Sequence, residues 1–133
     1  MKFSTRTTYG LRAMIRLAAG KSGDPLSLAT ISREEKISLG YLERLFARLK
    51  SAGLVRAEKG AGGGYRLAKK SDKIVIYDII KALEGKMSPF YCLGENGKIY
   101  CDVRCRCGAT LVLLKVQEAV NKTLREMKLS DLI

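Results

Sequence analysis

All four cysteines of this chain lie in one short segment, and they are the residues best suited to chemistry. Thiolates are soft, negatively charged donors, and several of them in one segment can bind zinc or an iron–sulfur cluster. Eight residues separate the first cysteine from the second, and five separate the second from the fourth. This cysteine segment, residues 91–108, reads YCLGENGKIYCDVRCRCG and contains Cys92, Cys101, Cys105 and Cys107.

The spacing of these cysteines leaves the bound group open. A zinc site with four cysteines usually contains C-x2-C pairs, and neither gap has that form. Buried structural cysteines are an unattractive interpretation, because the segment is polar and rich in glycine. Zinc, an iron–sulfur cluster and a regulatory disulfide therefore all remain open on spacing alone.

Histidine is absent from the chain. Imidazole ligation and a histidine-based catalytic triad are thereby excluded for this sequence. A cysteine nucleophile would also lack its usual partner base. We expect no enzymatic activity.

The positive charge of the chain is concentrated in its first half. Residues 1–70 carry 15 Lys and Arg against 5 Asp and Glu, whereas residues 71–133 carry 10 against 8. The first half therefore has a net charge of +10 and suggests a polyanion as its partner. No apolar run is long enough to span a bilayer, and the polar start lacks a secretory signal, so we expect a cytoplasmic protein with no membrane partner.

A first helix is expected over residues 5–19, with Ser4 or Thr5 as its N-cap. A fourth helix is expected to end at Gly85 and to pack on the first one. Apolar residues recur at helical spacing in both helices. They are Leu11, Met14, Ile15 and Ala18 in the first, and Ile76, Ile79, Ile80 and Leu83 in the fourth.

Two short helices joined by a tight turn are expected between residues 28 and 53. Ser27 and Ser38 are suitable N-caps, and Gly53 lies where a left-handed residue would end the second of the two. That second helix has a charged outer face and a buried stripe of Leu42, Leu45, Phe46 and Leu49. The arrangement is the helix-turn-helix pattern.

A glycine-rich hairpin follows, with strands expected at residues 54–58 and 65–67. The loop between them, KGAGGG, begins with the cation Lys59. Glycine lets a backbone approach another surface closely, as a wing does. A phosphate-cradling loop for nucleotides is disfavoured because the G-x-x-x-x-G-K-[ST] pattern is missing.

A long amphipathic helix is expected over residues 109–128. Its apolar residues, spaced by about 3.5, are Leu113, Val116, Val120, Leu124 and Met127, and we expect them to pack against a second copy of the chain. The predicted fold is mainly α with a small β-wing, a winged helix-turn-helix domain plus a long C-terminal dimerisation helix. Its three parts are residues 1–85, 86–108 and 109–133.

The candidate DNA-binding residues are those that this fold would turn towards a duplex. Glu43 could accept a hydrogen bond from a cytosine amine, and Arg44 or Arg48 could bind guanine edges or phosphates. A solvated face is an equally good interpretation for Glu43 alone. The full set is Thr5, Arg6, Tyr9, Arg12, Gly40, Tyr41, Glu43, Arg44, Arg48, Lys59, Gly62 and Gly63.

The stretch ISLGYLERLFARLKSAGLV (Ile37–Val55), followed by KGAGGGYRLAK (Lys59–Lys69) and three spaced cysteines, resembles the IscR/NsrR family of bacterial winged-helix regulators. Within that family the chain looks most similar to the IscR branch, which regulates iron–sulfur cluster assembly. The resemblance covers essentially the whole chain. It implies a homodimer, a palindromic operator in double-stranded DNA and an iron–sulfur cluster, with a cluster assembly scaffold or carrier as an open further partner. The family's three thiolate ligands correspond to Cys92, Cys101 and Cys107.

The fourth cluster ligand departs from the family pattern. Thr110 stands where regulators of the IscR branch have a histidine, and Thr8 stands where nitric-oxide-sensing relatives have an acidic residue. Cys105, Thr110 and Asp102 are the remaining candidates. The resemblance favours a 2Fe-2S cluster and leaves a 4Fe-4S cluster open.

The sequence thus predicts a transcriptional regulator, expected to be a repressor, that senses cluster status and controls genes of iron–sulfur cluster biogenesis. One alternative is a thiol- or zinc-dependent regulator of the same family, acting in cysteine metabolism or the nitric oxide response. Another is an adaptor that binds proteins rather than DNA, because fold alone does not fix function.

Overall fold

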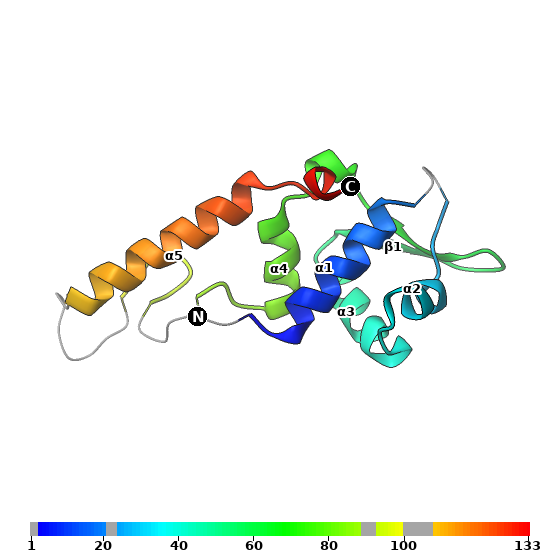
Figure 1. Ribbon diagram of the computed structural model, residues 1–133, viewed down its shortest axis with the longest axis horizontal. Helices are drawn as coiled ribbons and strands as arrows, with labels where there is room; N and C mark the ends of the chain where they lie inside the picture. The colour runs from blue at the N-terminus through cyan, green and yellow to red at the C-terminus, as the bar shows by residue number, and fades with distance from the viewer. Residues whose placement is uncertain (1–2, 21–23, 89–92, 100–107) are drawn as a thin grey trace.

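The fold is seen in a computed structural model that describes residues 3–20, 24–88, 93–99 and 108–133. Over these residues the chain forms α-helices, short 3-10 helices and a two-stranded antiparallel sheet. In chain order they are α1 (Thr5–Ala18), α2 (Leu28–Glu35), α3 (Leu39–Ser51), β1 (Val55–Glu58), β2 (Gly64–Leu67), η1 (Ser71–Lys73), α4 (Ile76–Glu84), α5 (Gly108–Glu126) and η2 (Leu129–Leu132) (Figure 1).

Serine caps set the starts of the first three helices, as the sequence predicts. The Ser4 hydroxyl accepts a hydrogen bond from the amide two residues on, and Ser27 and Ser38 accept from the amide three residues on. Each bond satisfies one of the amides that a helix start leaves unpaired. Between α2 and α3, Lys36 adopts a left-handed conformation with φ of 56°, which makes the tight turn of the helix-turn-helix.

The core lies where α1, α3 and α4 meet. Met14, Phe46, Leu49, Ile79 and Leu83 are fully buried there. The stripe predicted for α3 is confirmed, since all four of its members are buried.

The predicted face of α1 lies beside the most deeply buried one. Met14 is fully buried, and Leu11, Ile15 and Ala18 are half-buried against the core. The remaining buried residues of the helix are Thr7, Gly10, Ala13 and Leu17. The reason is a close helix crossing: a Cβ atom at Gly10 would overlap the side chain of Leu83 on α4. The side of α1 that carries Gly10 therefore lies against α4. Glycine has no apolar side chain, so the sequence gives no hydrophobic signal for this contact.

The wing is a hairpin in which Val55 pairs with Leu67 and Glu58 pairs with Gly64. Its base is fixed to the body, because Tyr65 forms a β-bridge with Leu26 and packs edge-on against Phe46, with ring centroids 4.9 Å apart. The loop beyond this base extends away from the helices (Figure 1).

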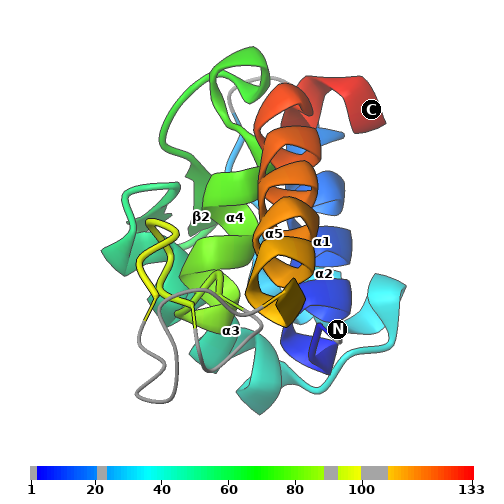
Figure 2. The same cartoon turned by 90° about the vertical axis from the view of Figure 1, so that its left-hand side faces the viewer.

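The long helix α5 lies against α4 and is held at its C-terminal end (Figure 2). Ile76 donates to the carbonyl of Met127, and Leu129 donates to the carbonyl of Ile74, both at 2.9 Å. Leu129 is fully buried beneath this short pairing. The N-terminal half of α5 projects beyond the winged domain (Figure 1), and no helix in the described ranges is both long and apolar enough to cross a membrane.

The stripe predicted for α5 is divided along the helix. Leu124 and Met127 pack against the core of this chain, Leu113 and Val120 are half-buried, and Val116 is exposed. The most buried side chains of α5 are polar: Thr110, Gln117 and Asn121. Leu111 and Val112 are 65% and 61% exposed. The exposed apolar side chains in the first half of α5 leave a surface for another polypeptide.

Candidate nucleic-acid interface

The first half of α3 is exposed on the same side of the molecule as the wing. Gly40, Glu43 and Arg44 all face solvent. The space beside Gly40 is open, since a Cβ atom there would meet nothing closer than the Ser38 hydroxyl at 4.0 Å. No internal contact therefore requires glycine at this point, and its absence of a side chain lets another surface come close.

The start of α1 joins this surface through two tyrosines. The rings of Tyr9 and Tyr41 pack edge to face with centroids 5.8 Å apart, and the hydroxyls of Thr5 and Tyr41 are 3.3 Å apart. The Arg44 guanidinium lies 5.6 Å from the centre of the Tyr41 ring. The structure thus brings together four of the predicted DNA-binding residues, which come from two helices.

The wing adds a cation and an open backbone. Lys59 is exposed at the root of the loop, and Gly62 has φ of 77° with no atom near its missing side chain. Gly63 differs, because a Cβ atom there would overlap the carbonyl oxygen of Glu58. We call the following residues the reading surface: Thr5, Tyr9, Gly40, Tyr41, Glu43, Arg44, Lys59 and Gly62.

Three predicted arginines have partners inside the protein. Arg12 pairs with Glu35 at 3.0 Å and donates to its carbonyl at 2.6 Å. Arg48 donates to the carbonyl of Leu83 at 3.2 Å, and Arg6 lies 3.5 Å from a carboxylate oxygen of α4. These bonds tie α1 and α3 to neighbouring helices, although a guanidinium has five N–H donors and keeps some of them free.

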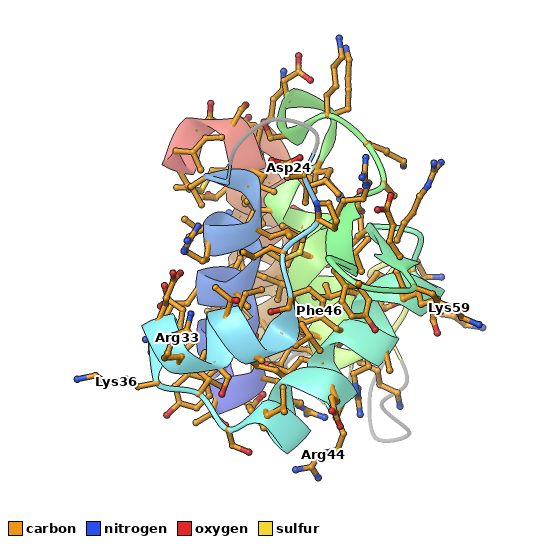
Figure 3. All side chains as sticks on the ribbon, turned by 90° about the vertical axis from the view of Figure 1, so that its right-hand side faces the viewer. Asp24, Arg33, Lys36, Arg44, Phe46 and Lys59 are labelled. Atoms are coloured by element: carbon orange, nitrogen blue, oxygen red, sulfur yellow. The ribbon has the colours of Figure 1, made fainter. Side chains whose placement is uncertain are left out.

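Several cations that the structure leaves exposed are not among the residues predicted from sequence. Lys36, at the turn between α2 and α3, extends outwards together with Arg44 and Lys59 across the face formed by α2, α3 and the wing (Figure 3). Lys50 and Arg56 are exposed beside the outer strand of the wing. Within the described ranges none of these side chains is in an ion pair, a property that depends on tertiary distances and that sequence spacing does not report.

Glu84 of α4 holds the start of α1, which carries Thr5 of the reading surface. Its Oε1 accepts from the amide and hydroxyl of Ser4, at 3.0 and 2.6 Å, and from the hydroxyl of Thr7 at 2.5 Å. Burial alone would raise the pKa of the Glu84 carboxyl, but these hydrogen bonds and the charge of Arg6 outweigh it and hold the pKa below its usual range. The carboxylate therefore stays ionised and anchors the first turn of α1.

The predicted cluster ligands fall almost entirely outside the described residues. Only Thr110 lies within them; it is 5% exposed in the first turn of α5. Thr8, which matches the acidic ligand of some relatives, is exposed on α1. In the described ranges no three cysteine or carboxylate side chains come together as a metal site. The predicted ligands outside these ranges are Cys92, Cys101, Cys105, Cys107 and Asp102.

The chain around the cysteine segment is fixed to two helices. Gln117 of α5, only 2% exposed, donates to the carbonyl of Gly94 at 2.8 Å. Glu95 accepts from the Met87 amide at 2.7 Å and lies 3.5 Å from the ammonium group of Lys81 on α4. The short hairpin at residues 93–99 is therefore connected to both α4 and α5.

Comparison with known proteins identifies the family. The family model Rrf2, described as an iron-dependent transcriptional regulator, matches residues 3–133. The chain belongs to the Rrf2 family. The resemblance found in the sequence is thereby confirmed, and the chain is a DNA-binding transcriptional regulator and not an enzyme.

Relatives match over nearly the whole of this chain and over most of their own length. The regulator IscR of Aliivibrio salmonicida is 34% identical over 133 residues, which is 100% of this chain and 77% of the relative. The solved structure of CymR, the global cysteine regulator of B. subtilis, is 36% identical with a TM-score of 0.82 and covers 99% of this chain and 95% of its own. The structure of T. potens IscR is 32% identical with a TM-score of 0.77, over 98% and 85%. The predicted winged-helix fold of the Rrf2 family is confirmed.

Proposed function

We propose that this Rrf2-family regulator is a homodimer that senses an iron–sulfur cluster and represses genes of iron–sulfur cluster biogenesis through a palindromic operator. The observation that carries the proposal is the full-length match to a family of iron-dependent regulators, because it spans the cysteine segment as well as the reading surface. The similarity to IscR proteins supports the choice of genes.

In the proposed complex, α3 enters the major groove by its N-terminal end. An α-helix fits that groove, and there each base pair presents a distinct set of donors and acceptors. Glu43 and Arg44 would meet base edges, while Tyr41 is held in place by Tyr9 and would stiffen the approach. The wing residues Lys59, Gly62 and Gly63 would lie along the adjacent backbone. Arg6, Arg12 and Arg48 would contribute phosphate contacts only through donors not already used inside the protein.

The donor set fits an iron–sulfur cluster, because it supplies three soft thiolates in one segment. We propose Cys92, Cys101 and Cys107 as those ligands. The fourth would come from Cys105, Asp102 or the Thr110 hydroxyl, which lies buried where α5 begins. When bound, the cluster would supply an iron centre sensitive to iron supply and oxidation; we propose the 2Fe-2S form, with 4Fe-4S as the alternative.

The homodimer would form through α5. Its exposed apolar residues, Leu111, Val112 and Val116, lie along the projecting half of the helix. Pairing two such faces would remove them from water, and the hydrophobic gain is roughly 25 cal/mol for each Å² buried. A two-fold dimer would place two reading surfaces on a DNA site with matching symmetry.

The described contacts offer a route from the cysteine segment to DNA. Glu95 binds the start of the cysteine-containing loop and Lys81 on α4. One helical turn further along α4, Glu84 binds the first turn of α1, where Thr5 contacts Tyr41 of the reading surface. In this proposal residues 93–99 have two arrangements, and the cluster binds one of them more tightly than the other. The resulting change in DNA affinity can be no larger than that difference in the free energy of cluster binding.

The test is anaerobic reconstitution with iron and sulfide. The native chain should develop a visible-range cluster spectrum, and the single variants Cys92→Ala, Cys101→Ala and Cys107→Ala should lose it. Cys105→Ala separates the candidates for the fourth ligand, since a changed spectrum would assign Cys105 and an unchanged one would favour Asp102 or Thr110. Intact spectra in all three of the first variants would contradict the proposed ligands.

A thiol-based regulator is the second candidate, supported by the likeness to CymR, a cysteine regulator. The iron-dependent description of the family model favours the cluster. Metal analysis separates the two: freshly purified anaerobic protein should contain iron and sulfide in the first case and neither in the second. Zinc alone would indicate a structural metal.

A further inference from the structure

Leu39, the first residue of α3, is an exposed leucine in an otherwise well-buried domain. It is 43% exposed, and between residues 24 and 88 it is the only large apolar side chain that the structure places at the surface. It does not belong to the hydrophobic core or to the residues that pack on it. A polar residue at this helix start would cost the fold little, so the internal structure gives no reason for leucine.

The surroundings of Leu39 are those of a contact surface. Ser38, the residue before Leu39, caps the helix. Gly40, the residue after Leu39, has open space where a side chain would lie. Glu43 lies four residues further on, and residues four apart are neighbours on one face of a helix. Leu39 and Glu43 therefore present an apolar group and a carboxylate side by side at the end of α3 that we propose to enter the groove.

We propose that Leu39 contacts the 5-methyl group of a thymine, within one or two base pairs of the base that Glu43 contacts. In the major groove the thymine methyl is the apolar group on a base edge, and the cytosine amine is the donor that suits a carboxylate. The pair Leu39 and Glu43 then recognises a thymine close to a cytosine. This inference rests on the proposed docking of α3 and adds a specificity residue to it.

The experiment starts from duplexes that the full-length protein selects from a random-sequence pool. Each thymine of the selected site is replaced in turn by uracil, which removes only the methyl group. For the native protein, each half-site should contain one thymine whose single replacement weakens binding about fourfold. This ratio corresponds to about 0.8 kcal/mol for one buried methyl group. Leu39→Ala should bind the thymine and uracil duplexes equally, because the side chain that meets the methyl is gone.

Lys50→Ala is the matched control. Lys50 is exposed on the same helix three turns later, so its loss should weaken binding to all duplexes and leave the methyl effect intact. If no thymine shows the effect in the native protein, or if Leu39→Ala retains it, the inference is wrong while DNA recognition by the reading surface stands. If selection recovers no duplex at all, both the inference and the proposed docking are wrong.

Discussion

Basic side chains around the reading surface differ in what they already bind. Arg12 and Arg48 form bonds to neighbouring helices, whereas Lys59 and Arg44 face solvent without an ion pair in the described ranges. A cation that is already paired must share or exchange its partner before it neutralises a phosphate. Free cations should therefore supply most of the salt-dependent part of DNA binding.

Lys59→Ala should lower the slope of log K against log salt by about one for each wing on the DNA. Arg12→Ala should lower it by less, because Glu35 already compensates that charge. Loss of the Arg12–Glu35 pair should reduce the free energy of unfolding by at most about 1 kcal/mol, as expected for an exposed ion pair. Binding titrations at several salt concentrations measure both. Equal slopes for the two variants would mean that the Arg12 pair opens on DNA.

Glu84 makes stability depend on pH in a definite direction. Its pKa is lowered in the folded protein, so its contribution is fully present above the pKa of the unfolded chain and is lost as pH falls through the folded value. At neutral pH, Glu84→Gln should lower the free energy of unfolding by roughly 1.5–3 kcal/mol, the range for hydrogen bonds to a charged group. The difference from the native protein should shrink below about pH 4.

Urea unfolding at pH 7 and pH 3.5 measures this dependence. Asp72→Asn is a suitable control, because Asp72 is exposed and has no side-chain bond to a described residue. A Glu84→Gln defect of the same size at both pH values would show that packing, and not the charge, is what Glu84 contributes.

At the scale of elements, caps and apolar spacing were enough to place most of the fold. Helix α2 and the starts of α1 and α3 follow from serine caps, and Gly53 and Gly85 adopt the positive φ expected at helix ends. The orientation of α1 was harder to predict, since the close approach at Gly10 carries no hydrophobic signal. The buried face of α5 was missed for a similar reason: Gln117 and Asn121 are polar, and only their partners in space explain their burial.

Gln117→Ala should loosen the hairpin at residues 93–99. The carbonyl of Gly94 would keep the hydrogen bond from the Gly97 amide but lose the one that joins it to α5, at a cost of roughly 0.5–1.5 kcal/mol. Hydrogen exchange should become faster at residues 93–99 and stay unchanged in α3. Glu118→Ala, at the exposed neighbouring residue, is the control and should leave the hairpin as it is. Unchanged exchange in Gln117→Ala would mean that α5 does not hold this hairpin.

At the scale of the whole molecule, the charge of the sequence and the shape of the fold agree. The basic first half forms the first three helices and the wing, and the nearly neutral second half forms α4 and the projecting helix α5. This division could be predicted from composition and from one glycine-rich loop. The pairing of cations with carboxylates could not, because it depends on which helices become neighbours.

Regulation depends on one connection in this proposal: a cofactor held by the cysteines alters DNA binding at the reading surface. The contacts of Glu95 and Glu84 join these two places through a single helix. Sensing and reading should therefore change together in the native protein. A variant that breaks the connection without touching either end, such as Lys81→Ala, should retain both activities and weaken their coupling.

The most direct measurement is the affinity for a selected duplex, determined anaerobically for cluster-loaded and cluster-free protein, with iron and acid-labile sulfide counted in the same samples. We expect about two iron and two sulfide ions per chain for a 2Fe-2S cluster, and a different DNA affinity in the two forms. Protein that takes up neither iron nor sulfide, or that binds DNA with the same affinity in both forms, would contradict the proposal.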